Sequence, residues 1–597
     1  MPDHSARLAA LRAQLQHERL DGFVVPLTDE HMSEYVGAYA QRLGWLTGFQ
    51  GSAGTAVVLA DTAAIFTDGR YTLQVREQVS GDNWDYVAVP ATSVAAWLGK
   101  HVGQGARIGY DPWLHTAGFV AEASAALTKH GATLVAVDAN PVDAIWTDRP
   151  APSDAKLSVH DDIVAGRNSA EKRADIADWL AEQSADAVVL SALDSIAWAL
   201  NIRGGDVAHT PVALAYAIVD ADGTAALFVA PDKMTDAVAQ HLGNAIRVRD
   251  RAHFDDALSA YAGKRVAVDS DRSVSAIPAA LEAAGATVLA LRDPVVLAKA
   301  IKHPAEIAGH RAAQARDGAA LTRFLRWVED AALAGGQTEL SAAAKLHEFR
   351  AAGGLFKDES FETISATGPH GAIPHYRVDQ ASNLPIEEGQ LYLVDSGGQY
   401  ADGTTDVTRV VPIGAPSDEM RDRFTRVLKG HIALATAVFP AGTTGGQLDA
   451  FARRPLWDAG LDYPHGTGHG IGAYLSVHEG PQRIAMPNYP GGGPTEPLRA
   501  GMMLSNEPGY YKAGEYGIRI ENLILVEDRA PPGAEAAMLG FATLTFVPIE
   551  RSLVEVALLS DEERRWLNSY HSEVLDVLGP ELDSAERSWL MDKCAPL

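Results

Sequence analysis

The segment from Leu391 to Val526 constrains the fold more than any other part of the chain, because short apolar runs there alternate with glycine-rich turns and end in polar residues. An apolar run of strand length precedes Asp395, and another precedes Glu507. His469 lies between two glycines, and the segment contains no cysteine. The pattern predicts buried strands that hold carboxylates and imidazoles in fixed positions. Such hard ligands suit Mn²⁺, Mg²⁺, Fe²⁺, Co²⁺ or Zn²⁺ rather than a thiolate site.

Two acidic residues of this segment, Asp395 and Glu507, have ordinary structural explanations. An aspartate at a strand end, such as Asp395, commonly forms a turn or caps a helix. Asp406 follows the turn signal Asp402–Gly403, so a hairpin would return it to the neighbourhood of Asp395. A proline and a glycine follow Glu507, which favours a turn over the start of a helix. Each residue alone is a weak signal of function.

Three histidines, His465, His469 and His478, occur among glycines with little bulky side chain between them. Glycine lets the backbone pass close to an ion or a substrate. A single histidine is more often structural or exposed than a ligand, but three in such a run favour a functional site.

Arg519 and Glu521 stand two apart on an apolar, strand-like run, so both side chains are expected on the same face. A buried glutamate requires a charge partner or a metal. From the sequence, Glu521 as a metal ligand and Glu521 as the ion-pair partner of Arg519 are both open.

The charge balance narrows the function classes. The formal net charge is −27, from 50 basic and 77 acidic side chains, which argues against binding to nucleic acid or to an anionic membrane. No apolar run is long enough to span a membrane, and the N-terminus lacks the pattern of a signal peptide. Cys594 is the only cysteine, so an internal disulfide is impossible and a reducing compartment fits. We therefore expect a cytoplasmic protein.

The first half of the chain predicts two α/β domains. A chain of 597 residues is too long to fold around a single hydrophobic core. Helices are predicted at 5–20, 170–183 and from 194, and strands at 23–25, 56–59, 63–66, 134–137, 187–190, 213–219 and 225–229, the last two as a hairpin. A proline-rich linker is predicted at 140–155. Within this first half, residues before and after the linker show the same order of elements, which indicates a diverged repeat of about 150 residues. Two unrelated α/β domains remain an alternative.

The second half begins with the longest helical pattern, over 306–334, in which Leu321, Phe324, Leu325 and Val328 share one face. A second helix is predicted at 340–350, and strands with glycine-rich turns from 361 to about 550. Ser560 and Glu563 form a capping-box signal for a C-terminal helix. Its apolar residues could contact a second copy of the chain or its own domain.

The order Asp395, Asp406, His469, Glu507 and Glu521 resembles that of the pita-bread metallopeptidase family, M24, which includes methionine aminopeptidase, prolidase and aminopeptidase P. Further runs resemble the first and second domains of its large, three-domain, cytosolic-type Xaa-Pro aminopeptidases; these are Leu27–Tyr35, Gly48–Thr55, Thr67–Tyr71 and Trp198–Val207. The resemblance implies two related creatinase-like α/β domains, at 1–150 and 151–302. An α+β pita-bread catalytic domain at 303–597 would follow, with 551–597 as a short helical extension.

The resemblance also implies two divalent metal ions, with Mn²⁺ first and Zn²⁺ or Co²⁺ as alternatives. Asp395 would bind one ion, His469 and Glu507 the other, and Asp406 and Glu521 both. Two ions about 3.5–4 Å apart can hold a hydroxide that attacks the first peptide bond.

Further roles follow from the same resemblance. Glu507 would move a proton to the leaving nitrogen, and His375 and His478 would hydrogen-bond the substrate carbonyl or the tetrahedral intermediate. His465 would line the pocket of the second residue, Arg519 would hold a ligand carboxylate, and Tyr511 would join that network.

Pro374 and the loop 487–497, with glycines at 491–493, are less typical of the family. The implied substrates are peptides with proline at position two, and the implied assembly is a homodimer.

Three alternatives are open. A prolidase would cleave only X-Pro dipeptides, but prolidases have one N-terminal domain where this chain has two. A creatinase-like hydrolase shares the fold without the metal carboxylates. A catalytically dead binding module would lose ligands and usually carries a long acidic tail.

Overall fold

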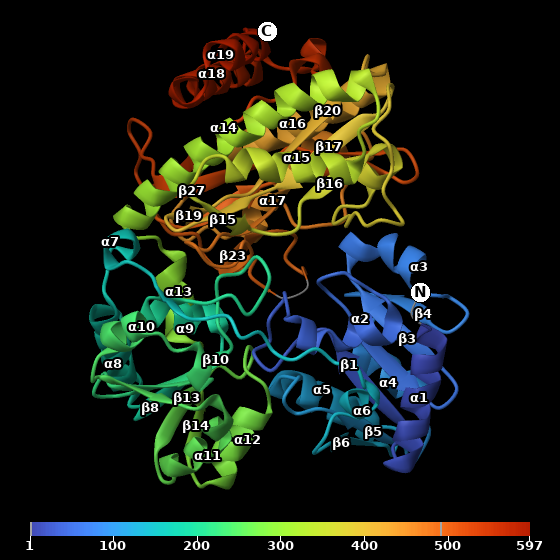
Figure 1. Ribbon diagram of the computed structural model, residues 1–597, viewed down its shortest axis with the longest axis vertical. Coiled ribbons are helices and arrows are strands. Elements are labelled where there is room, and N and C mark those ends of the chain that lie inside the picture. The colour runs from blue at the N-terminus through green and yellow to red at the C-terminus, as the bar shows by residue number, and fades with distance from the viewer. Residues whose placement is uncertain (1–2, 490–491) are drawn as a thin grey trace. The chain divides into compact units, whose positions relative to one another are not determined.

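Two six-stranded sheets with the same topology form the N-terminal half of the chain in the computed structural model, which describes residues 3–489 and 492–597 (Figure 1). The chain divides into two units. Unit 1 contains the residues up to Asp162 and Arg167–Val296, and unit 2 contains Ile163–Gly166 and Leu297–Leu597.

The first sheet of unit 1 has the strand order β4-β3-β2-β1-β5-β6. The pairs β1–β2 and β2–β3 are antiparallel, and β3–β4, β1–β5 and β5–β6 are parallel. Its strands are β1 (Gly22–Pro26), β2 (Thr55–Leu59), β3 (Ala63–Thr67), β4 (Asp85–Ala88), β5 (Arg107–Tyr110) and β6 (Thr133–Ala136). Its helices are α1 (His4–His17), α2 (Arg42–Thr47), α3 (Gln74–Gln78), α4 (Val94–His101), α5 (Ala117–Thr128) and α6 (Pro141–Ile145). The predicted helix and four strands are confirmed here, with ends that differ by a few residues.

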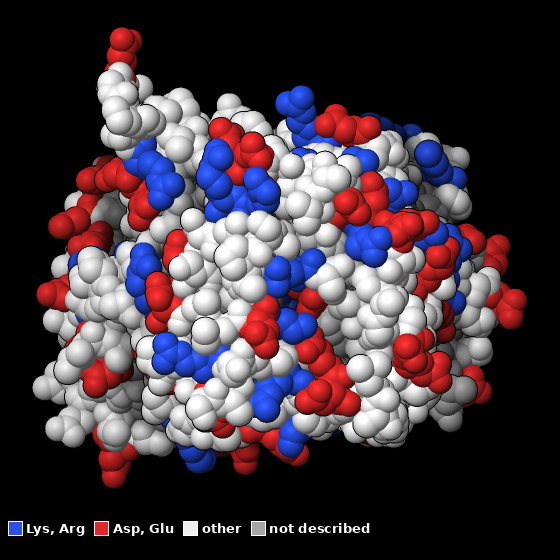
Figure 2. Space-filling model, turned by 90° about the horizontal axis from the view of Figure 1, so that it is seen from above, with Lys and Arg blue, Asp and Glu red and all other residues white. Residues whose placement is uncertain are grey.

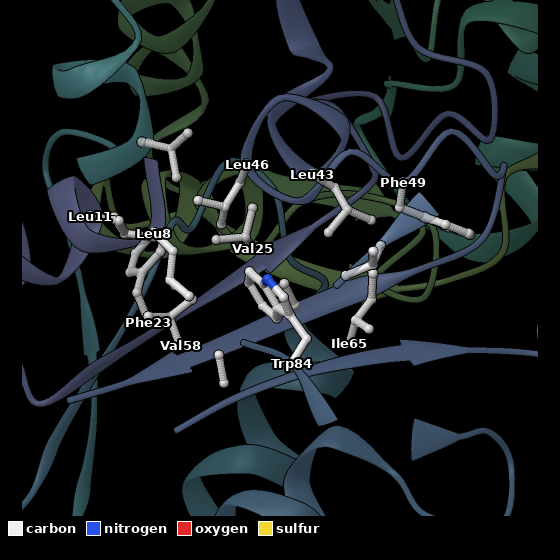
Figure 3. Packing of buried hydrophobic residues seen from close by; sticks show 14 of the residues in the cluster. Leu8, Leu11, Phe23, Val25, Leu43, Leu46, Phe49, Val58, Ile65 and Trp84 are labelled. Carbon is white, nitrogen blue, oxygen red and sulfur yellow. The ribbon is translucent and has the colours of Figure 1, made fainter. Parts of the chain in front are cut away.

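Both faces of this sheet are buried. Figure 3 shows Leu8 and Leu11 of α1 and Leu46 of α2 packed near Val25 of β1. Val24, the neighbour of Val25, belongs to a second cluster, because successive strand residues point to opposite faces. Burial on both faces explains why the central strands are continuous apolar runs.

The second sheet repeats the first strand by strand, in the order β12-β11-β10-β8-β13-β14. The pairs β8–β10 and β10–β11 are antiparallel, and β11–β12, β8–β13 and β13–β14 are parallel. Its strands are β8 (Ala187–Leu190), β10 (Ala215–Asp220), β11 (Ala225–Val229), β12 (Ile246–Arg249), β13 (Arg265–Val268) and β14 (Thr287–Ala290). Its helices are α8 (Ser169–Gln183), α9 (Leu193–Leu200), α10 (Asp236–Leu242), α11 (Phe254–Leu258) and α12 (Ala276–Ala283). This agreement supports the repeat over two unrelated domains.

The predicted linker at 140–155 is wrong at its start, because α6 begins there. The Asn140 side chain accepts a hydrogen bond from the Val142 N–H, and Pro141 occupies the first helical position. Proline is favourable there because the first N–H groups of a helix have no intrahelical partner. Val142 joins the first core, so this segment is part of the domain.

Unit 2 contains a six-stranded sheet of order β21-β28-β27-β24-β22-β23, the three-stranded sheets β15-β18-β19 and β16-β17-β20, and the hairpin β25-β26. The strands are β15 (Phe356–Glu359), β16 (Ile364–Thr367), β17 (Leu391–Ser396), β18 (Gly398–Tyr400), β19 (Gly403–Thr404), β20 (Val407–Pro412), β21 (Val438–Pro440), β22 (Gly468–Gly470), β23 (Glu479–Ile484), β24 (Met503–Asn506), β25 (Gly509–Lys512), β26 (Tyr516–Arg519), β27 (Asn522–Asp528) and β28 (Met538–Thr543). The longer helices are α14 (Pro304–Ala334), α15 (Glu339–Ala351), α16 (Asp418–Ala435), α17 (Gly445–Trp457), α18 (Asp561–Leu578) and α19 (Ser584–Lys593).

The long helix α14 supports the strand that carries Asp395. The predicted stripe is confirmed, because Leu321, Phe324, Leu325 and Val328 are all buried in one cluster with Val394 of β17. A Phe→Ala change in such a core costs about 3–5 kcal/mol.

Two helices interrupt the region that was predicted to contain only strands and turns. α16 begins after Ser417, whose side chain accepts a hydrogen bond from the Met420 N–H. It buries Phe424, Val427 and Leu428 on one face, and α17 packs against it. The three- and four-residue spacing of these apolar residues is visible in the sequence, so the prediction of strands and turns alone was wrong here.

The C-terminal helix α18 packs on its own unit. The Ser560–Glu563 capping box is present, and Leu567, Tyr570 and Val574 are buried. α18 contacts α14 and α16, and α14 also contacts α19 (Figure 1). Between the two alternatives left open by the sequence, these apolar residues therefore contact their own unit.

Charged side chains of both signs are interspersed on the face of the molecule in Figure 2. Surface ion pairs such as Lys512–Glu419, at 2.9 Å, typically contribute about 0–1 kcal/mol. Within the described ranges, no helix combines the length and apolar character needed to cross a bilayer.

Candidate metal centre

A hairpin brings the two aspartates together, as predicted. β17 and β20 are antiparallel, with Asp395 opposite Thr408 and Ser396 opposite Val407. Asp406 stands immediately before β20, and both aspartates are buried. The connection returns through the antiparallel pair β18–β19.

Glycines allow His469 to lie within the six-stranded sheet. A Cβ atom at Gly468 would lie 2.0 Å from the carbonyl oxygen of Ser505, and one at Gly470 would lie 2.4 Å from that of Glu479. Any side chain at either position would therefore push β22 away from its neighbours. Glu507 directly follows β24, and its N–H donates to the Thr467 carbonyl at 2.8 Å.

Arg519 and Glu521 do not lie on one strand, which corrects the prediction. Arg519 ends β26, and Glu521 precedes β27. Their side chains nevertheless meet at Thr408: Arg519 Nε donates to its Oγ1 at 3.0 Å, and this hydroxyl donates to Glu521 Oε2 at 2.7 Å. The ion-pair partner of Arg519 is Asp395, at 2.6 Å between Nη2 and Oδ2. The alternative in which Arg519 pairs with Glu521 is therefore replaced.

Four carboxylates and one imidazole converge in this region. Ligand atoms of Asp406, His469 and Glu521 all lie within 4.8 Å of one another. His469 Nε2 lies 3.4 Å from Asp406 Oδ2 and 3.6 Å from Glu507 Oε1. Asp395 Oδ1 is buried without a hydrogen-bond partner. This donor set of carboxylate oxygens and imidazole nitrogen fits divalent metal ions.

The electrostatics of the cluster also favour a cation. Burial raises the pKa of Asp406 well above its usual range, and the Asp395 carboxylate raises it further. Burial likewise raises the pKa of Glu521 well above its usual range, with Asp406 adding to the shift. Burial raises the pKa of Glu507, with His469 and Arg519 opposing the shift. Buried like charges are tolerated only when they take up protons or cations.

The remaining predicted residues are connected to this cluster. The rings of His478 and His469 are 4.3 Å apart, and those of His375 and His478 are 6.4 Å apart. His478 is therefore a neighbour of both His469 and His375.

His465 is joined to the cluster through Tyr511. Its Nδ1 lies 2.7 Å from the Gly466 carbonyl, so Nδ1 carries the proton and Nε2 accepts from the Tyr511 hydroxyl at 2.8 Å. The same hydroxyl accepts from Arg519 Nη1 at 2.7 Å. Burial raises the pKa of Tyr511 to about 12, so the phenol keeps its proton.

Sequence reasoning missed three residues with a direct part in this arrangement. Thr408 joins Arg519 to Glu521, and its place two residues after Asp406 was an available signal. Arg409 donates to the Glu521 carbonyl at 2.7 Å. Glu339 is fully buried and accepts hydrogen bonds from the segment that carries His375. No local sequence pattern marks Glu339.

Two residues of the atypical loop 487–497, Pro490 and Gly491, lie outside the described residues. At its start, Tyr489 contacts the Arg483 guanidinium, 5.1 Å from the ring centre. Gly493 has a φ of +94°, a backbone conformation that favours glycine.

Comparisons with known proteins cover the whole chain. Residues 308–528 match the model of metallopeptidase family M24, and residues 537–597 match the C-terminal region of peptidase M24. Residues 7–148 and 148–306 match two models of the creatinase/prolidase N-terminal domain.

Individual relatives agree over the full length. The chain is 41% identical to a probable Xaa-Pro aminopeptidase P of Laccaria bicolor, over 99% of this chain and 93% of that protein. It is 41% identical to aminopeptidase P2 of Arabidopsis thaliana, over 97% and 86%. The X-prolyl aminopeptidase of Caenorhabditis elegans, described as a cytosolic enzyme with a di-nuclear active site, superposes with a TM-score of 0.94 at 34% identity, with 100% of both chains covered. The chain therefore belongs to metallopeptidase family M24.

Proposed function

We propose that this protein is a metal-dependent aminopeptidase that releases the N-terminal residue from peptides with proline at position two. The observation that carries the proposal is the buried convergence of Asp406, His469 and Glu521, with Asp395 and Glu507 beside them, in a chain similar over its full length to Xaa-Pro aminopeptidases.

We assign the ligand roles from the resemblance to the family. Asp395 would hold one ion, His469 and Glu507 a second, and Asp406 and Glu521 both. Two divalent ions, when bound, supply an activated water and polarise the scissile carbonyl. Mn²⁺ is the first candidate, and Zn²⁺ and Co²⁺ are alternatives. Arg519 holds Asp395 through a hydrogen bond of 2.6 Å, which fixes the direction of that carboxylate.

Proton transfer falls to Glu507. Burial raises its pKa, which favours a carboxylate that takes a proton from the attacking water and passes it to the leaving nitrogen. The imidazoles of His375 and His478 would donate hydrogen bonds to the carbonyl oxygen as it gains charge. His465, held by Tyr511, would line the pocket of the second residue. An X-Pro bond has no N–H, so the site has no amide proton to bind.

The proposal also covers the domain boundaries, the assembly and the location of the protein. We place the domain boundaries at about residues 150 and 302, close to the family matches and within the usual range of domain sizes. A homodimer and a cytoplasmic location are proposed, the latter supported by the cytosolic description of the Caenorhabditis elegans relative. Sedimentation of the purified protein tests the dimer.

The function is tested with three peptides, Arg-Pro-Pro, Ala-Pro and Ala-Ala-Ala, after chelation and with Mn²⁺ restored. Metal-dependent release of Arg from Arg-Pro-Pro, with little cleavage of Ala-Ala-Ala, supports the proposal. Cleavage of Ala-Pro alone would indicate a prolidase, and cleavage of all three would remove the proline preference. A folded protein that cleaves none under any metal would indicate a binding module.

A further inference from the structure

Arg409 is a fully buried guanidinium whose hydrogen bonds all run to uncharged oxygens. The side chain is 2% exposed. Its partners are the carbonyl oxygens of Pro548, Thr408, Glu521 and Val547, together with Asn522 Oδ1 and the Tyr570 hydroxyl, at 2.7–3.1 Å. A guanidinium has five N–H donors in a planar fork, and the two on Nη2 are shared among Asn522 Oδ1, the Val547 carbonyl and the Tyr570 hydroxyl. This one group therefore connects several backbone segments.

Two of those segments carry candidate metal ligands. Arg409 Nη1 donates to the Thr408 carbonyl at 2.8 Å and to the Glu521 carbonyl at 2.7 Å. Thr408 stands two residues after Asp406, and Glu521 is itself a candidate ligand. The Thr408 hydroxyl also donates to the Glu521 carboxylate. Arg409 therefore connects the backbone at Glu521 to the backbone two residues after Asp406.

The C-terminal extension completes this arrangement through Tyr570 of α18. The Tyr570 hydroxyl accepts from Arg409 Nη2 at 2.9 Å and from the Val547 N–H at 3.1 Å, and it donates to the Val547 carbonyl at 2.8 Å. The ring is buried and stacks on Trp566, with centroids 5.3 Å apart and planes 4° apart. Helix α18 thus holds the hydroxyl against the guanidinium.

We propose that Arg409 and Tyr570 are positioning residues for the metal centre, so that the C-terminal helix α18 sets the metal affinity without contributing a ligand. The inference rests on the proposed function, because it takes Asp406 and Glu521 as ligands. Partners one step outside a ligand shell typically change metal affinity about 10–100-fold. Tyr570 acts through Arg409, so the lower end of that range applies to it.

The test compares Tyr570→Phe with wild-type protein, both stripped of metal, by calorimetric titration with Mn²⁺ and by thermal unfolding without metal. We expect Tyr570→Phe to bind Mn²⁺ about tenfold more weakly. Its kcat/KM should recover at saturating Mn²⁺, because every ligand is intact. Arg409→Lys should bind more weakly still, because one ammonium group cannot reach acceptors on so many segments.

Tyr216→Phe is the matched control, because Tyr216 is a buried tyrosine of unit 1 whose hydroxyl donates to the Glu30 carbonyl at 3.3 Å. It should keep wild-type Mn²⁺ affinity even if its melting temperature falls. A folded Tyr570→Phe protein with wild-type Mn²⁺ affinity and only a lower melting temperature would overturn the inference. If wild-type protein itself fails to bind Mn²⁺, Zn²⁺ or Co²⁺, the proposed function fails first, and the inference fails with it.

Discussion

The buried ion pairs of unit 1 and the carboxylate cluster of the candidate metal centre in unit 2 arrange buried charge in opposite ways. In unit 1, Lys233 lies 2.5 Å from Asp206, and both side chains are almost fully buried. Arg42 makes two hydrogen bonds with Asp143. In unit 2, the four carboxylates of the candidate metal centre lie together, and the Arg519 guanidinium forms an ion pair with one of them, Asp395, at 2.6 Å. Charge pairs completed by the protein itself indicate a structural role, whereas a cluster of like charges indicates a ligand from outside.

The largest expected effect comes from Asp406→Asn. Peptide hydrolysis should fall by more than the roughly 100-fold upper cost of losing an outer partner, because a ligand is lost. The metal-free protein should become more stable, because one of several repelling carboxylates is gone. Hydrolysis assays and urea unfolding without metal measure the two quantities. Activity within tenfold of wild type would show that the like-charge cluster is not the catalytic centre.

Asp206→Asn in unit 1 is expected to lower the stability of the protein, whereas Asp406→Asn is expected to raise the stability of the metal-free protein. Removing one partner of a buried pair leaves Lys233 charged and uncompensated, which costs about 3–5 kcal/mol. The exposed Glu182 provides the control, since Glu182→Gln should stay within about 0.5 kcal/mol. Both are compared by urea unfolding. Equal stability of the two variants would mean that the buried Lys233–Asp206 pair contributes nothing to stability, and the contrast with the carboxylate cluster would fail.

Glu339 is an intermediate case, a buried carboxylate of unit 2 with protein partners only. It accepts from the Thr367 N–H, the His370 ring and the Leu384 N–H at 2.8–2.9 Å, and thereby holds the segment that carries His375. Glu339→Gln places an NH₂ group against these donors, which costs about 1–3 kcal/mol of stability.

We expect Glu339→Gln to lower kcat/KM about tenfold, which corresponds to about 1.4 kcal/mol. The exposed Glu348 on the same helix is the control, and Glu348→Gln should leave kcat/KM unchanged. An unchanged kcat/KM in a destabilised Glu339→Gln protein would show that Glu339 has only a structural role, like the Lys233–Asp206 pair.

The smallest expected effect is a change with pH in the amount by which Mn²⁺ raises the melting temperature. The folded-state pKa values of Asp406 and Glu521 are raised above their unfolded values, first by burial. Without metal, the folded state therefore gains stability as pH falls through those raised values, because it binds protons that the unfolded chain does not. Metal binding requires the deprotonated forms. The rise in melting temperature on adding Mn²⁺ should shrink by a few degrees between pH 8 and pH 6. A rise that stays constant would contradict this reading.

Local patterns were sufficient for part of the site. Asp395 and Asp406 were predicted to meet because an apolar run, a turn signal and a second apolar run define a hairpin. The stripe on α14 and the capping box at Ser560 were predictable for the same reason, since each is encoded within a few residues.

Long-range pairing was not encoded in this way. The sequence suggested Glu521 as the partner of Arg519 because the two are close along the chain, but the partner is Asp395, 124 residues away. Glu339 and Arg409 were missed because their partners come from segments that only the folded unit brings together. Periodicity indicates which face of an element is buried, and it does not indicate which distant side chain meets that face.

The contact between Tyr570 and Arg409 has a consequence for local unfolding. If α18 separates from the rest of unit 2, the Tyr570 hydroxyl leaves the Arg409 guanidinium, which also donates to the Glu521 carbonyl. Because metal binding and folding are coupled, bound Mn²⁺ is expected to slow this local opening. Hydrogen exchange of the α18 amides would then report metal binding at a centre to which the helix contributes no proposed ligand.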